Sequence, residues 1–271
     1  KELSGWGNFP KKMSRVQFPT DKKNINLNVK GSIIARGMGR SYGDSSFNKN
    51  HTVDMLSVNK ILNFDKKKGT ILVEAGVTLK DVLELVVKHG WFPPVSPGTK
   101  YVTVAGMVAC DVHGKNHHNS GSFSHFVKEI KIIDSNKKLK ICSRKINADL
   151  FKKTIGGMGL SGIIMEVNFQ LLKVETAYIK QEASNHLSLI NLMTKFEKEK
   201  NQEYSVAWLD CTSYSKANGY IKSVFFKGKH AKKRELKFIQ NKKHNHSFKD
   251  RNIQFPIGLF KFFINNLTIR I

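Results

Sequence analysis

Two segments of the sequence combine glycines with polar side chains at a spacing that could bind a cofactor. The first, Arg36 to Ser46, has the sequence RGMGRSYGDSS and follows an apolar run at Ser32 to Ala35. Glycines let the backbone adopt positive φ and let successive N–H groups converge on an anion without obstruction by Cβ atoms. The spacing G-x-G-x-x-x-G is one residue longer than the Rossmann fingerprint, and hydroxyl groups come from Ser41, Ser45 and Ser46. This segment predicts a pyrophosphate-binding loop, with a tight structural loop as the alternative.

The second segment, Cys110 to His118, has the sequence CDVHGKNHH and comes after two glycine turns, Pro97 to Thr99 and Thr103 to Gly106. Thiolate and imidazole groups are zinc ligands, so a metal site is one interpretation. The segment contains neither a C-x2-C nor an H-E-x-x-H pair. The flanking glycines favour backbone that lies close to a planar ligand, and we expect no metal.

A literal G-x-G-x-x-G occurs at Gly157, Gly159 and Gly162. It follows an expected helix and leads into an expected strand, which is the reverse of the order in a dinucleotide-binding Rossmann unit. Two interpretations stay open: backbone brought close to a bound ligand, or a structural turn. The sequence has no P-loop motif, so hydrolysis of a nucleoside triphosphate has no support.

The elements that must position these segments mix strands and helices. The clearest helix is Thr78 to His89, where Thr78 and Asp81 can form a capping box and Gly90 can end the helix. Other expected elements are strands at 53–56, 70–74 and 162–172, a hairpin of 128–134 with 138–143, and a helix at 147–153. After Lys173 the pattern restarts, with a strand at 177–181, a helix around 186–198 and strands at 204–210 and 220–226. The pattern predicts an α+β fold with one domain at 1–175 and a second, incomplete one at 176–271.

Composition limits the class of protein. The 271 residues are 40% hydrophobic and carry a formal net charge of +25, which favours an anionic partner. Three separated cysteines imply no disulfide framework and favour a reducing compartment. No apolar run reaches the length of a membrane span. The chain begins at Lys1 and ends within the apolar stretch 255–271, so we expect a fragment of a protein that is cytoplasmic or peripheral to the inner membrane.

The ordered motifs resemble the vanillyl-alcohol-oxidase-type, or PCMH-type, FAD-binding oxidoreductases, and among them the decaprenylphosphoryl-β-D-ribose 2′-oxidases. The similar segments are Leu3–Gly7, Arg36–Ser46, Val73–Val77, Pro97–Thr99, Thr103–Gly106, Cys110–His118, Gly121–Phe123, Gly156–Ile164 and Ser205–Trp208. The resemblance covers nearly the whole chain and is strongest before Leu172.

The resemblance implies a two-subdomain FAD-binding domain followed by the N-terminal part of a substrate, or cap, domain. It implies contacts to FAD from Ala35, Arg36, Gly37, Met38, Gly39, Arg40, Ser41, Tyr42, Gly43, Asp44, Ser45, Gly98, Thr103, Val104, Ala105, Gly106, Cys110, Asp111, Val112, His113 and Ile164. His113, Gly114 and Lys115 would line the substrate cavity, joined by Val206 and Trp208 from the cap. The family often has Ser at the position of Val206, and the valine side chain has no polar group for the contact that the serine would make.

The implied chemistry is hydride transfer from a secondary hydroxyl of a sugar to the flavin while a base removes the hydroxyl proton. The substrate would be a polyprenyl-phosphate-linked pentose, and a partner NAD(P)H-dependent reductase could complete an epimerisation. We expect the family's lysine near flavin and substrate to lie beyond this fragment, so the catalytic base is unassigned. FAD would be non-covalent, because Gly39 to Tyr42 offers no attaching histidine.

Two alternatives stay open at this stage. An aldonolactone or sugar-alcohol oxidase would use the same FAD scaffold with another cap. A basic nucleic-acid-binding protein could use the lysine-rich segment 227–251, with Phe225, Phe226, Phe238 and Phe248 as stacking groups. The second leaves both glycine clusters unexplained, so we expect no nucleic-acid partner. The apolar segment 255–264 and the basic surface would suit an amphiphilic substrate at an anionic membrane.

Overall fold

The computed structural model describes residues 1–215 and 219–239, which form two units. The first unit holds residues 1–178 and 230–236, and the second is built from residues 179–229. The chain passes from the first unit to the second after residue 178 and returns to the first at residue 230. The apolar segment 255–264 and Phe248 lie outside the described residues. Among the residues described, no helix has both the length and the apolar composition that a membrane crossing requires.

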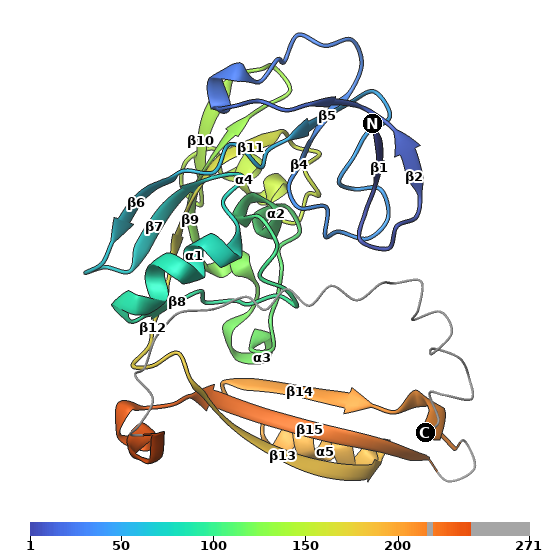
Figure 1. Cartoon of the computed structure of the whole chain (residues 1–271), viewed down its shortest axis with the longest axis vertical. Coiled ribbons are helices and arrows are strands. Elements are labelled where there is room, and N and C mark those ends of the chain that lie inside the picture. Colours follow the sequence, from blue (N-terminus) through green and yellow to red (C-terminus); the bar gives the residue numbers. More distant parts are fainter. Residues whose placement is uncertain (216–218, 240–271) are drawn as a thin grey trace. The chain divides into compact units, whose positions relative to one another are not determined.

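A five-stranded antiparallel sheet forms the centre of the first unit, in the order β10-β9-β11-β7-β6 (Figure 1). Its strands are β6 (Ile61–Asp65), β7 (Thr70–Glu74), β9 (Val127–Ile133), β10 (Leu139–Ser143) and β11 (Ile163–Gln170). The predicted hairpin is β9–β10, and the predicted strand at 162–172 is β11. A bulge lies between Ile164 and Glu166. Successive side chains of β11 point to opposite faces of the sheet, so the strand serves two different cores.

A second, parallel sheet has the order β3-β5-β4. It consists of β3 (Arg15–Gln17), β4 (Ile33–Arg36) and β5 (His51–Asp54). The glycine loop that the sequence singles out is the crossover between β4 and β5. Two short pairs complete the strands of this unit: β1 (Glu2–Ser4) with β2 (Lys11–Met13), and β8 (Trp91–Phe92) with β12 (Leu172–Lys173).

The first unit has four short α-helices, and the first, second and fourth of them pack against one face of the large sheet. They are α1 (Leu79–Val86), α2 (Val104–Ala109), α3 (His117–Ser120) and α4 (Ala148–Thr154), with 3-10 turns η1 (Lys22–Asn24), η2 (Val87–His89) and η3 (Phe123–Phe126). The capping box of Thr78 and Asp81 is present, and Gly90 ends η2 with φ +76°. The predicted helix at 78–89 is confirmed, because its signals are local to the sequence.

Two hydrophobic cores result, one on each face of β11. Leu79, Val82, Met107 and Phe151 from the helices meet Val167 and its neighbours on one face. On the other face Ile163 and Met165 pack with Val53, Met55 and Val58 from the region of the parallel sheet. Ala105 of α2 packs against both cores. The start of α2 therefore lies where the two cores meet.

The second unit is a three-stranded sheet covered by one helix (Figure 1). Its elements are β13 (Ile179–Ser188), α5 (Leu189–Lys198), β14 (Tyr204–Leu209), η4 (Cys211–Ser213) and β15 (Tyr220–His230). The 3-10 turn η5 (Lys233–Ile239) begins among the residues that return to the first unit. The predicted helix start near His186 is wrong. His186 belongs to β13, where its carbonyl accepts a hydrogen bond from Ser223 Oγ at 3.1 Å, and Ser188 is the residue that caps α5.

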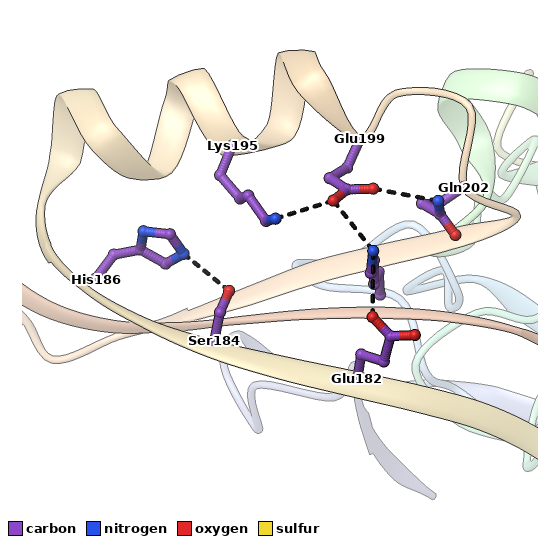
Figure 2. A network of polar contacts seen from close by, with 7 residues as sticks. Glu182, Ser184, His186, Lys195, Glu199 and Gln202 are labelled. Atoms are coloured by element: carbon purple, nitrogen blue, oxygen red, sulfur yellow. Dashed lines mark hydrogen bonds and ion pairs between the residues drawn. The ribbon is translucent and has the colours of Figure 1, made fainter.

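A network of charged side chains ties α5 to its sheet (Figure 2). Glu199 Oε1 accepts hydrogen bonds from Lys195 Nζ at 2.9 Å and from Lys227 Nζ at 3.1 Å. Lys227 also pairs with Glu182 on β13 at 3.2 Å. The hydrogen bonds from Lys195 and Lys227 lower the pKa of Glu199 to about 2. Lys227, the first residue of the lysine-rich segment in the nucleic-acid alternative, is engaged in this network.

Replacing Glu199 with glutamine should lower the melting temperature of the second unit in a pH-dependent way. A carboxylate with a depressed folded pKa stabilises fully above its unfolded value and loses this effect as the pH falls through the folded value. The difference in Tm between wild type and variant should be constant from pH 7 to about pH 5. The difference should shrink as the pH falls from 4.5, the ordinary pKa of the carboxyl group, to about 2, its pKa in the folded protein. Glu197→Gln, on the exposed side of the same helix, is the control and should change little; a pH-independent difference for Glu199→Gln would contradict the assignment.

Candidate cofactor site

The first glycine loop is held in place by Arg36, the last residue of β4. Its guanidinium donates to Ser46 Oγ at 2.8 Å and, through Nη2, to the carbonyl of Ser4 at 2.9 Å. The amide of Trp6 donates to the carbonyl of Ser41 at 2.8 Å. Arg36 therefore closes the loop at its two ends and joins it to the N-terminal strand β1.

The loop leaves several hydrogen-bond donors without a protein partner. Gly39 and Gly43 have φ of +62° and +63°, which turns the backbone in a way that favours glycine. Throughout the described chain, the N–H groups of residues 38–42 donate to no protein group. Ser41 Oγ is buried and also has no hydrogen-bond partner there. Because a buried polar group is normally paired, the buried Ser41 Oγ and the free amides beside it fit an anionic ligand.

Gly37 brings the glycine loop against the start of α2. A Cβ atom at Gly37 would lie 2.2 Å from Thr103 Oγ1, the side chain that caps α2 by accepting from the amide of Gly106 at 3.2 Å. The two segments that the sequence predicts for the cofactor, 35–45 and 103–106, are thus neighbours. Gly37 is required for this close approach, a reason that sequence spacing did not indicate.

Asp111, just after α2, anchors the segment 110–118. Its carboxylate accepts hydrogen bonds from Ser122 Oγ at 2.8 Å and from the amide of Ser124 at 2.9 Å. These bonds fix the turn that presents His113, whose backbone pairs with Ser122. Cys110 Sγ lies 3.8 Å from Met158 Sδ, and burial raises the pKa of the Cys110 thiol. Cys110 therefore stays protonated near neutral pH.

The loop with the literal G-x-G-x-x-G motif packs on the end of α2. The amide of Gly156 donates to Val108 O at 3.1 Å, and that of Met158 donates to Ala109 O at 2.8 Å. A Cβ atom at Gly162 would lie 2.3 Å from Ile133 O. These contacts favour the structural-turn interpretation of the motif, in a position next to Cys110.

His113 and Lys115 project into solvent from a turn whose base is buried. Asn116, between them and α3, is buried and donates from Nδ2 to Pro94 O at 2.8 Å. This bond ties the turn to the segment that contains Gly98. The His113 and His117 rings have centroids 5.6 Å apart, but the described residues hold no group of three metal-ligating side chains suited to an ion.

The remaining predicted residues are distributed as follows. Val104 and Ile164 have buried side chains in the core beside α2, so only backbone of Val104 could touch a ligand. Ala35 packs in the core on the other face. Val206 and Trp208 lie on β14 in the second unit, where Trp208 is exposed.

Comparison with known proteins identifies the region that contains this site. A family described as an FAD binding domain matches residues 27–143, which include the glycine loop, α2 and the turn at His113. Residues 27–143 belong to the FAD-binding domain family. The chain is also 36% identical to decaprenylphosphoryl-beta-D-ribose oxidase of Mycolicibacterium smegmatis over 79% of this chain and 49% of that protein.

Relatives of lower identity match shorter stretches of the chain. L-gulonolactone oxidase 5 of Arabidopsis thaliana is 28% identical over 56% of this chain and 27% of that protein. The human Delta(24)-sterol reductase is 25% identical over 58% of this chain and 30% of that protein. The chain spans about half the length of the M. smegmatis relative and less of the others.

The geometry fits FAD. The free amides of residues 38–42 and Ser41 Oγ would donate to the two anionic phosphates, and the absence of side chains at Gly39 and Gly43 would leave room for them. The residues at 103–106 and 110–113 follow directly beside them, since Gly37 contacts Thr103. Asp111 is satisfied by Ser122 and Ser124, so its part in the FAD-binding domain is to anchor the turn.

Sequence reasoning missed the N-terminal hairpin as a support of the FAD-binding domain. A Cβ atom at Gly5 would lie 2.5 Å from the carbonyls of both Ser41 and Gly43. The guanidinium of Arg40 stacks over the Trp6 ring at 5.1 Å. The segment Leu3–Gly7 contributed to the family resemblance, but only the glycine that precedes Trp6 hinted at a close backbone contact.

FAD is expected to be released by acid. The loop from Gly37 to Ser46 contains no histidine, the residue that attaches flavin in covalent relatives. Precipitating the purified full-length protein with acid should leave the yellow colour in the supernatant. A covalently flavinylated oxidase treated in parallel should keep its colour in the pellet, and the same behaviour here would contradict non-covalent binding.

Proposed function

We propose that this chain is the cofactor-binding part of an FAD-dependent oxidoreductase that oxidises a CH–OH group. The observation that carries the proposal is the glycine loop with free donors, which Arg36 and the N-terminal hairpin hold beside α2. Bound FAD supplies hydride acceptance at its ring. The residues of the chain bind the pyrophosphate and present an exposed turn, His113 to Lys115, beside the expected site.

We propose as substrate a polyprenyl-phosphate-linked pentose, oxidised at its 2′-hydroxyl to a keto sugar. Support comes from the M. smegmatis relative, which matches 79% of the chain and is named for a decaprenylphosphoryl ribose. The positive surface is compatible with a phosphorylated substrate. Lys115 can bind an anionic or hydroxyl group, and the exposed His113 imidazole can hold or move a proton. A keto-sugar reductase that uses NAD(P)H would complete an epimerisation.

The second candidate is oxidation of a soluble aldonolactone or sugar alcohol. Lactone oxidases also match this chain, two of them at 28% and 26% identity over about half of its residues. The M. smegmatis relative shares more of the chain, including residues of the second unit, which makes the lipid-linked pentose the preferred substrate.

Anaerobic reduction of the flavin distinguishes the two substrates. Full-length oxidised protein is mixed with polyprenyl-phosphoryl-ribose in detergent micelles and, separately, with aldonolactones and free sugars, and the flavin absorbance is followed. We expect rapid bleaching with the lipid-linked pentose alone. Bleaching by a lactone but not by the lipid would establish the alternative.

A pair of variants tests the role of the turn in the same assay. Lys115→Ala should slow bleaching by the lipid-linked pentose at least about tenfold, the effect of one lost charged contact, without loss of FAD. Lys128→Ala, an exposed lysine on β9, is the matched control and should bleach at the wild-type rate. Equal rates for both variants would remove Lys115 from the substrate site.

A further inference from the structure

The N-terminal hairpin and the segment after it expose four large apolar side chains. Phe9 is 80% exposed, Met13 67%, Phe18 61% and Trp6 58%. Leu3 on β1, by contrast, is buried. The first 18 residues therefore bury Leu3 and expose four large apolar side chains, and exposed apolar groups gathered in one short segment are typical of an interaction site. We name these four residues the hairpin surface.

Basic side chains surround the hairpin surface. Residues 1–18 contain Lys1, Lys11, Lys12 and Arg15, and their one acidic residue is Glu2. Lys1 Nζ lies 5.7 Å from the centre of the Phe18 ring. Aromatic and apolar groups bordered by lysine and arginine are the composition of segments that lie in the headgroup region of an anionic bilayer.

The hairpin surface has a fixed place beside the cofactor loop. Gly5 packs on the carbonyls of Ser41 and Gly43, and Trp6 stacks on Arg40. Lys12 Nζ also lies 4.0 Å from an Asp44 carboxylate oxygen on that loop. Anything that binds the hairpin surface therefore lies next to the FAD-binding loop.

We propose that the hairpin surface docks the protein on an anionic phospholipid bilayer. Phe9 and Met13 enter the boundary between headgroups and acyl chains, while Lys1 and Lys11 contact lipid phosphates. The inference rests on the proposed function in one respect: a polyprenyl-phosphate substrate lies in a bilayer, and docking at the hairpin brings the cofactor loop to it. Its evidence is the exposure and charge of the hairpin.

Vesicle flotation with the full-length flavin-loaded protein tests this docking. Wild type should float with vesicles of phosphatidylcholine and phosphatidylglycerol, less so at high salt, and weakly with phosphatidylcholine alone. The double variant Phe9→Ser, Met13→Ser should lower partitioning to the anionic vesicles by about tenfold or more. The control is Leu139→Ser, Ile146→Ser, which removes two exposed apolar side chains elsewhere in the first unit and should partition as wild type.

Three outcomes decide the matter. Equal flotation of the hairpin variant and wild type, or no flotation of wild type, would overturn the proposal; the second result would mean that protein covers the hairpin surface. FAD absorbance of each variant shows that it is folded.

Bleaching by the lipid-linked pentose in detergent separates this inference from the proposed substrate, since the hairpin variant should bleach normally there. Loss of flotation without any bleaching of wild type would support docking and reject the substrate.

Discussion

Replacing Gly39 with valine is expected to give a protein that folds but no longer retains FAD. Gly39 has φ +62°, a conformation that costs a residue with a Cβ atom about 1–2 kcal/mol. The added Cβ would lie 2.2 Å from Arg36 Nη2 and would displace the guanidinium that holds Ser4 and Ser46. The loop would then lose both its shape and its link to the N-terminal hairpin, while the two cores stay intact.

A matched pair of alanine variants separates the two effects. Gly43 has nearly the same φ, +63°, but an added Cβ there meets nothing within 4 Å. Gly43→Ala therefore adds a methyl group and backbone strain without displacing a protein group, and Gly39→Ala adds the displacement of Arg36. We expect FAD affinity, measured by flavin fluorescence, to fall in the order Gly43→Ala, Gly39→Ala, Gly39→Val. Stoichiometric FAD on purified Gly39→Val would refute the loop assignment.

Replacing Glu166 with glutamine is expected to lower the unfolding free energy of the first unit by about 2–3 kcal/mol. This is less than the loss expected for a fully buried ion pair, because both lysine partners of Glu166 are partly exposed. Glu166 is buried on the central strand β11, where its carboxylate lies 2.7 Å from Lys22 Nζ and 2.8 Å from Lys131 Nζ. Lys22 also lies 3.6 Å from Glu74, the residue paired with Glu166 in the sheet. Glutamine keeps the volume but leaves two positive charges with less compensation.

The stabilisation by Glu166 should depend on pH. Burial alone would raise the pKa of Glu166, but the ammonium groups of Lys131 and Lys22 outweigh burial and hold it below its ordinary value. The contribution is therefore complete above about pH 4.5 and is lost as the pH falls through the folded pKa. Urea unfolding of wild type and variant at pH 7 and pH 4 measures this. Glu84→Gln, which removes an exposed i,i+4 pair with Lys80, is the control and should cost less than about 0.5 kcal/mol; an equal cost for Glu166→Gln would contradict the prediction.

Elements with local signals could be predicted from the sequence, and contacts between distant segments could not. The helix at Thr78 carries its own cap and stop, and the β9–β10 hairpin carries its own turn, so both were found. The exact start of α5 was missed, because pairing with β15 keeps His186 in a strand. The helices α2 and α3 are too short for a periodic pattern to reveal them.

The cofactor site divides in the same way. The glycine loop and the turn at His113 were recognisable as segments, because glycine spacing and polar clusters are visible in one stretch of chain. The packing of Gly37 on Thr103 and of Gly5 on Ser41 joins residues far apart in the sequence. No pattern within either segment encodes such a contact, so the support of the loop emerged from the fold.

The bonds that Arg36 makes to Ser4 and Ser46 have a consequence for how FAD binds. They give the crossover between β4 and β5 its shape without help from a ligand, so the entropy of ordering that loop is lost during folding. A preorganised loop keeps more of its contact energy as affinity, since little ordering is left to offset it. In protein from which the flavin has been removed, the loop therefore keeps the conformation that binds the pyrophosphate, and rebinding of FAD needs little further ordering of the loop.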